Sequence, residues 1–140
     1  MDDAVIKYYR YLLKTNFEHA GSLDDASIVL DAIGERAINC GEIDAFMKLY
    51  VRIADNRIED IKYQCSCEPI TNVAVEILCV LMKGKSLDEA ATLTEESFSR
   101  FLESENEELR IRGKALLEFV MRGIERYRVE GSPHGRQETP

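Results

Sequence analysis

Two cysteines, Cys65 and Cys67, stand where an expected strand runs into an expected helix. Pro69 suits the first helical position, because its missing N–H would have no helical partner there. The helix is indicated by apolar residues at a 3.6-residue period: Ile70, Val73, Ala74, Ile77, Leu78 and Leu81. Both thiols therefore lie near the positive end of a helix dipole, which favours the thiolate form. A thiolate binds metals and attacks sulfur, so this junction is the first candidate site.

The other two cysteines differ in setting. Cys40 begins a Cys-Gly-Glu turn that ends at Glu42. We expect the Cys40 thiol to lie opposite the junction, as a third thiol. Cys79 lies between apolar residues inside the expected helix and is predicted to be a small core residue. The alternative for Cys40, Cys65 and Cys67 is that they are ordinary thiols of a protein in a reducing compartment.

The bulk composition narrows the class of protein. The chain has 140 residues, enough for one domain with a core. Its 18 basic and 26 acidic residues give a net charge of −8, which argues against nucleic-acid binding. There is no apolar run of roughly 20 residues that would cross a membrane. The acidic start Met-Asp-Asp does not resemble a signal peptide, so we expect a cytoplasmic protein whose thiols serve metals or catalysis rather than disulfides.

Hydrophobic periodicity predicts strands first and most helices later. A helix over 3–15 is followed by three strands, within 27–37, over 45–53 and over 57–64, with a bulge at Glu59-Asp60. Helices are expected over 69–83, from a capping box at Ser86 to about 93, around 98–102, and over 106–127. The fold class is α+β: a small antiparallel three-stranded sheet covered by helices. We expect one domain over 1–129 and a disordered tail over 130–140.

The order of several motifs resembles a known family, the iron–sulfur cluster assembly scaffolds of the NifU N-terminal or IscU-like type. The motifs that carry the resemblance are Asn16 with Gly21-Ser-Leu-Asp24, Cys40-Gly-Glu42, the strand pair with Arg57-Ile-Glu-Asp60 and Tyr63, and Lys83-Gly-Lys-Ser-Leu-Asp-Glu-Ala90. The match covers roughly residues 5–128. The order and spacing of these motifs together carry the resemblance.

The resemblance implies a function. Such scaffolds receive sulfur from a cysteine desulfurase, bind iron, build a 2Fe–2S cluster and pass it to acceptor proteins. Their ligands are three cysteines and the aspartate of Cys-Gly-Asp, a set that also binds zinc. Carried over, this assigns Cys40 directly and Glu42 at the aspartate position. A one-residue shift in the alignment places Cys67 at the family's second cysteine. Without the shift, Glu68 falls at that position. Glu68 is then either a replacement ligand or simply an acid in the first turn of the helix.

The sequence departs from the family pattern at the third cysteine. That position falls near Arg112 or Gly113, and Cys65 has no family counterpart. We hypothesise that the extra thiol replaces the lost one, so that Cys40, Cys65, Cys67 and Glu42 form the site. Cys65 and Cys67 are two residues apart and can share one face of a strand. Arg112 would pair with a carboxylate, cover the site, or be a plain surface charge.

Three functions remain open at this point. The first is a scaffold that is not an enzyme: a junction cysteine attacks a desulfurase persulfide, and the site then holds iron and sulfide, or zinc. The second is a zinc-bound or metal-free adaptor that docks a desulfurase. The third, a thiol-dependent enzyme using Cys67, lacks a histidine beside it, since His19 is expected at the surface.

Tyr8, Tyr9 and Tyr11 belong to the core and rim of the first helix or to a partner interface. We expect no nucleic-acid or membrane partner, and a monomer or homodimer.

Overall fold

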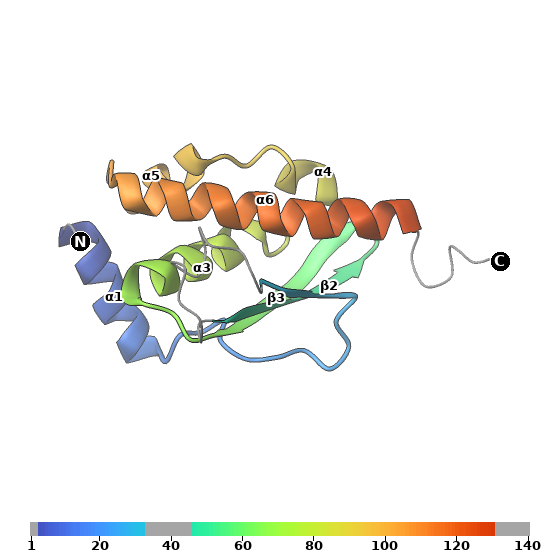
Figure 1. Cartoon of the computed structure of the whole chain (residues 1–140), viewed down its shortest axis with the longest axis horizontal. Coiled ribbons are helices and arrows are strands. Elements are labelled where there is room, and N and C mark those ends of the chain that lie inside the picture. The colour runs from blue at the N-terminus through green and yellow to red at the C-terminus, as the bar shows by residue number, and fades with distance from the viewer. Residues whose placement is uncertain (1–2, 33–45, 131–140) are drawn as a thin grey trace.

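Three antiparallel strands carry a layer of helices in the computed structural model, which describes residues 3–32 and 46–130 (Figure 1). In chain order the elements are α1 (Asp3–Thr15), β1 (Ile28–Asp31), β2 (Met47–Ala54), β3 (Arg57–Cys65), α3 (Pro69–Met82), α4 (Leu87–Ala90), α5 (Glu95–Leu102) and α6 (Glu107–Glu130). The predicted α+β class and the three-stranded sheet are confirmed.

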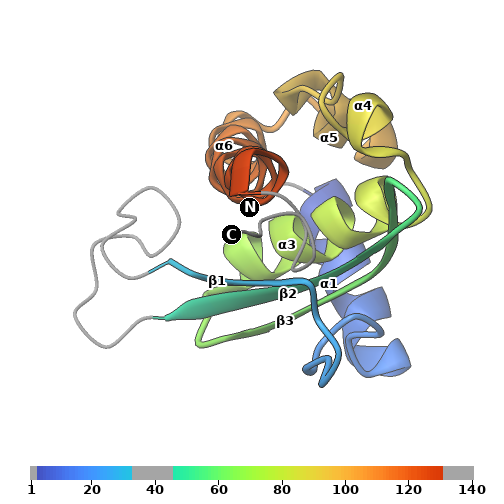
Figure 2. The same cartoon turned by 90° about the vertical axis from the view of Figure 1, so that its right-hand side faces the viewer.

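The sheet has the order β1-β2-β3, and one face is buried. Met47, Leu49 and Val51 of β2 are fully buried, whereas the alternating residues between them are partly exposed. Figure 2 shows α3 and α6 on the same side of the sheet. This alternation is what a strand with one solvated face requires, and it is the pattern from which the strand was predicted.

A tight turn and a bulge fix the β2–β3 hairpin. Asp55 and Asn56 have φ angles of 54° and 60°, the left-handed values that a two-residue hairpin turn needs. Arg52 pairs with Asp60 and Ile53 pairs with Ile58, so Glu59 is the extra residue of a bulge. The bulge predicted at Glu59-Asp60 is confirmed.

Two glycines let α6 approach its neighbours closely. A Cβ at Gly113 would lie 2.7 Å from the ring of Phe98 on α5. A Cβ at Gly123 would lie 2.5 Å from Leu30 on β1. Helix α6 therefore packs against both α5 and the first strand, and it closes the core over α3.

The helix boundaries match the sequence signals closely. Gly84 follows α3 with φ 87°, and Ser86 and Glu89 form the predicted capping box of α4. Leu13 of α1 is 53% exposed, because the core meets α1 mainly through Val5 and Leu12. The tail expected over 130–140 lies outside the described residues apart from Glu130, the last residue of α6.

None of the helices in the described ranges is both long and apolar enough to cross a bilayer.

Candidate metal and sulfur site

Cys65 and Cys67 lie together at one end of the sheet. Cys65 is the last residue of β3 and pairs with Met47, the first residue of β2. Cys67 comes immediately before Glu68, the N-cap of α3. Both cysteines are partly exposed and pack against the edge of the core. The two-residue spacing thus brings both sulfurs to one place, as the sequence predicted.

The two sulfurs are joined in a disulfide, with the Cα atoms 5.4 Å apart. This differs from the expectation that the thiols are free. The Cα separation falls inside the range that disulfides normally span, so the bond forms within the local backbone of the junction. Metal ligation needs thiolates, and the junction can offer a pair of them only after a two-electron reduction.

The segment that carries Cys40 and Glu42 starts and ends at this same end of the sheet. Both residues lie outside the described residues. The Ala32 N–H, just before the segment, donates to the carbonyl of Met47 at 2.9 Å. Phe46, just after it, accepts from the Ser66 N–H and donates to the Ser66 hydroxyl, each at 3.0 Å. Ser66 stands between the two cysteines, so the chain leading away from Cys40 and Glu42 is tied to the junction itself.

Within residues 3–32 and 46–130, no three His, Cys, Asp or Glu side chains are grouped so that they could hold a metal. A joint site therefore depends on the segment that carries Cys40 and Glu42. The donor types fit the expected cargo, because thiolates suit zinc and cluster iron, and a carboxylate can complete the set.

Arg112 reaches the same junction from α6. Its Nη2 atom lies 2.9 Å from Oε1 of Glu68 and 3.6 Å from Oε2 of Glu108. The Arg112 side chain is only 13% exposed, whereas that of Glu68 is 43% exposed. Arg112 thus pairs with a carboxylate, one of the expected alternatives, and is not a plain surface charge. The pair places a guanidinium beside the residue that follows Cys67.

A second polar cluster lies deeper, in the middle of α3. The carboxyl group of Glu76 is 2.9 Å from Nδ1 of His19 and accepts from the His19 backbone N–H at 3.2 Å. The Tyr63 hydroxyl lies 2.8 Å from both Glu76 and Asn72. His19 is 8% exposed, so its predicted surface position is wrong. It is buried because Glu76 supplies a partner for both its backbone N–H and its ring Nδ1.

Burial and the negative charge of Glu76 raise the pKa of Tyr63 well above its usual range, burial being the larger cause. This cluster was not expected from the sequence. One signal was available, since Glu76 is the only charged residue in the sequence of α3. An isolated acid in an apolar helix usually indicates a buried partner.

Cys79 is fully buried, which confirms its assignment to the core. Burial raises the pKa of its thiol well above the usual range, with a smaller contribution from Glu76. A thiol that is inaccessible and held protonated does not serve as a ligand or nucleophile. The reactive sulfurs of the described chain are therefore those of the junction.

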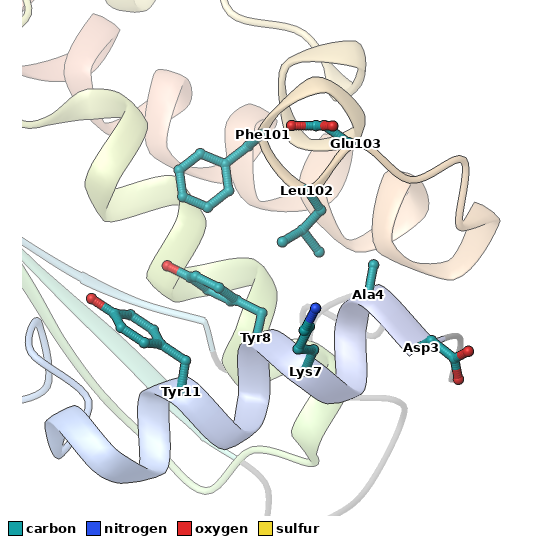
Figure 3. A pocket seen from close by; sticks show the side chains of 8 residues that line it. All are labelled: Asp3, Ala4, Lys7, Tyr8, Tyr11, Phe101, Leu102 and Glu103. Carbon is teal, nitrogen blue, oxygen red and sulfur yellow. The ribbon is translucent and has the colours of Figure 1, made fainter.

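A groove between α1 and α5 is a separate surface feature (Figure 3). It has a volume of about 670 Å³ and is lined by α1 residues between Asp3 and Tyr11 and, at the end of α5, by Phe101, Leu102 and Glu103. The Tyr8 ring packs edge-on against Phe101, with centroids 5.5 Å apart, and stacks on the Tyr11 ring at 5.7 Å. Tyr8 thus lies between core and rim, as expected for this tyrosine cluster.

The sheet, its helical cover and the paired cysteines at a strand–helix junction define a small α+β domain with a candidate sulfur site at one end of the sheet. The family model of the NifU-like N terminal domain matches residues 3–130, and the chain belongs to this family. The resemblance expected from the sequence is therefore confirmed.

Two curated relatives agree with this family. Two iron-sulfur cluster assembly scaffold proteins of the IscU type from Archaeoglobus fulgidus are each 33% identical over 91 residues. The match covers 62% of this chain and 53% of each relative, so the chain spans about half the length of the curated relatives it matches.

Two solved structures share the fold. A nitrogen-fixing NifU-like protein (N-terminal) from Brucella abortus superposes with a TM-score of 0.60 at 10% identity, covering 93% of this chain and 95% of that one. A putative iron-sulfur cluster assembly scaffold protein for the SUF system from Fervidobacterium islandicum has a TM-score of 0.52 at 16% identity, covering 87% and 85%. At these identities the likeness shows the fold alone.

Proposed function

We propose that this protein is a scaffold on which iron and sulfide are assembled and from which they are passed on, and that it binds and transfers rather than turning over a substrate. The observation that carries the proposal is the meeting of Cys65 and Cys67 at the end of the sheet where the Cys40 segment begins and ends. Family membership and the printed names of the Archaeoglobus relatives support it.

The proposed ligands are Cys40, Cys65, Cys67 and Glu42. Three thiolates and one carboxylate would hold a 2Fe–2S cluster, or zinc, as cargo. Cys65 stands in for the cysteine that the family carries near Arg112. Since Glu68 is paired with Arg112 at 2.9 Å, its carboxylate is engaged, and we do not include it among the ligands.

The proposed partners are a cysteine desulfurase, which supplies sulfur, and proteins that accept the product. The family resemblance implies that the N-terminal region meets the desulfurase. On α1, Tyr11 and Leu13 are each 53% exposed and would provide apolar contact area for such a partner. The net charge of −8 disfavours a nucleic-acid partner. A cytoplasmic location, the absence of membrane partners, and a monomer or homodimer remain part of the proposal.

One observation favours a second candidate function. An arginine stands near the position where the family has its third cysteine, and it is held there by Glu68. This arrangement suits a zinc-bound or metal-free adaptor that docks a desulfurase without building a cluster.

The experiment that separates the two candidates is an analysis of iron, zinc and acid-labile sulfide per chain. The protein is reduced, kept anaerobic, and reconstituted with ferrous iron and inorganic sulfide. The scaffold predicts iron and sulfide in equal, near-stoichiometric amounts. Zinc alone at about one per chain, or no metal and no sulfide, would overturn the scaffold in favour of the adaptor.

A further inference from the structure

The Cys65–Cys67 disulfide bears on how sulfur would be handled at the proposed scaffold site, and the inference below rests on that proposed function. The bond joins the last residue of β3 to the residue before the N-cap of α3. The strand pairing of Cys65 with Met47 and the helix start at Pro69 are both present while the bond is formed. The two sulfurs can therefore meet without loss of the strand or the helix.

Access and chemistry distinguish these two cysteines from Cys79. Cys65 and Cys67 are each partly exposed, so a reagent or a partner's sulfur can reach them. Cys79 is fully buried, and burial raises the pKa of its thiol. Within the described residues, the only pair of sulfurs that can exchange electrons through a shared bond is the one at the junction.

The surroundings favour Cys67 as the first sulfur to react. It lies at the N-terminal end of α3, whose 14 residues direct the positive end of the helix dipole toward it. The carboxylate of the adjacent Glu68 would oppose a thiolate, but Arg112 lies 2.9 Å from that carboxylate and offsets its charge. Cys65, at the end of the strand, stands within bonding reach of Cys67 Sγ.

We propose that Cys65 and Cys67 form an internal dithiol that reduces an incoming sulfane sulfur to sulfide. In the first step the Cys67 thiolate attacks the outer sulfur of a partner's cysteine persulfide. The new bond joins Cys67 Sγ to that sulfur, the old sulfur–sulfur bond breaks, and the partner's cysteine leaves as a thiolate.

In the second step the Cys65 thiolate attacks Sγ of Cys67. The bond between Cys67 Sγ and the outer sulfur breaks, and its electron pair leaves with that sulfur as hydrosulfide. The transferred sulfur gains two electrons, and the two cysteines lose them as the disulfide forms. A dithiol reductant, of protein or small-molecule class, then returns the disulfide to two thiols and makes them available as ligands again.

Cys65 would therefore supply electrons for sulfide release as well as a ligand. The proposal explains why a cysteine without a family counterpart stands two residues before Cys67. It also fixes an order of events, because the pair cannot ligate metal while it is a disulfide. Sulfide release comes first, and re-reduction prepares the junction to hold iron.

The test is a single turnover without iron. Reduced, desalted, anaerobic protein is mixed with one equivalent of glutathione persulfide and no other reductant. Released sulfide is measured, and the protein mass is taken after acid quenching. Wild type is expected to release about one sulfide per chain and to lose two hydrogens. Peptide mapping is expected to find the new disulfide between Cys65 and Cys67.

Cys65→Ser removes the second thiol and is expected to keep the added sulfur as a persulfide, releasing sulfide at least about tenfold more slowly. Cys79→Ala is the matched control, since it removes a buried thiol, and it is expected to behave like wild type. Sulfide release by Cys65→Ser at the wild-type rate, or a wild-type disulfide that joins other cysteines, would overturn the proposal. The mapping result needs no variant, so a folding defect in Cys65→Ser does not affect it.

The assay contains no metal, so it is independent of cluster binding. A protein that takes up inorganic iron and sulfide but fails this assay would retain the scaffold function and lose only the internal reductant. A protein that releases sulfide but holds no iron would retain the internal reductant and lose the scaffold function.

Discussion

Helix α3 meets polar side chains at two places, and the two differ in burial. At its N-terminus, Glu68 is 43% exposed and pairs with Arg112 beside two partly exposed cysteines. In its middle, Glu76 is 1% exposed and bonded to His19 and Tyr63. The first region is open to solvent and to partners, whereas the second is closed.

The difference in burial indicates different roles: the accessible N-terminus of α3 suits chemistry, and the buried Glu76 cluster suits holding the fold together. The Glu76 cluster links three segments: α3, β3 through Tyr63, and the loop that carries His19. That loop also runs along β3, with the Tyr63 N–H donating to the His19 carbonyl at 3.0 Å and the Gly21 N–H donating to the Tyr63 carbonyl at 2.8 Å. A buried, bonded cluster of this kind holds elements in place. The proposed ligand exchange and sulfur transfer would need the accessible groups at the N-terminus of α3.

The largest expected effect comes from Glu76→Ala. It removes the acceptor of the His19 backbone N–H, the partner of His19 Nδ1 and one of the two partners of the Tyr63 hydroxyl, so buried polar groups of His19 are left unpaired. We expect a loss of about 3 kcal/mol or more in the free energy of unfolding, measured by denaturant titration of reduced, metal-free protein. Iron and sulfide bound per folded chain should not change.

Glu76→Gln is the matched control, since it keeps the shape and one acceptor oxygen. It should cost clearly less than the alanine variant. A loss below about 1 kcal/mol for Glu76→Ala, or a folded variant that no longer binds metal, would contradict the division between the two regions.

Alkaline pH should act next, through two tyrosines: Tyr63 in the buried cluster and Tyr8 in the groove between α1 and α5. Burial raises the pKa of Tyr8 from 10.0 to about 12, and that of Tyr63 is raised as well. The unfolded chain therefore releases these protons at lower pH than the folded protein does. The associated stability is complete below about pH 10 and is lost as pH rises toward about 12.

Tyr63→Phe isolates one part of this effect. It should cost about 1 kcal/mol at neutral pH, because a buried hydrogen bond is lost. It should also make the alkaline decline in unfolding free energy shallower than in wild type. An equally steep decline in denaturant titrations across this pH range would show that Tyr63 does not contribute.

Smaller stability effects are expected at the exposed region. Arg112→Ser removes the pair with the partly exposed Glu68 and should lower the free energy of unfolding by less than about 1 kcal/mol.

Arg112→Cys places a thiol near the position of the family's third cysteine. We expect it to slow iron loss to a chelator by roughly tenfold relative to Arg112→Ser, about 1.4 kcal/mol of added affinity. Equal rates for the two variants would mean that this position does not reach the metal.

Local sequence signals predicted most of the fold. Alternation in β2, the turn at Asp55-Asn56 and the capping box at Ser86 each depend on residues near in sequence, and all three are present. The bulge at Glu59 was detectable because the alternation of β3 slips there.

Features formed by residues distant in sequence were harder to predict. His19 was expected at the surface, but its partner Glu76 lies 57 positions away. Arg112 and Glu68, 44 positions apart, meet only because α6 packs on α3. At the candidate site, the two-residue spacing predicted that the Cys65 and Cys67 side chains lie close together, but their disulfide was not expected. Joint ligation with Cys40 and Glu42 stays a prediction.

The most direct test of the account is a comparison of cysteine alkylation in reduced protein before and after loading with iron and sulfide. Iodoacetamide labelling is read for each cysteine by peptide mass spectrometry. The account predicts that Cys40, Cys65 and Cys67 react readily without cargo and are protected together when it is bound, while Cys79 stays unlabelled until the protein is unfolded. Equal labelling of Cys65 and Cys67 in loaded and unloaded protein would contradict the claim that this junction holds the metal.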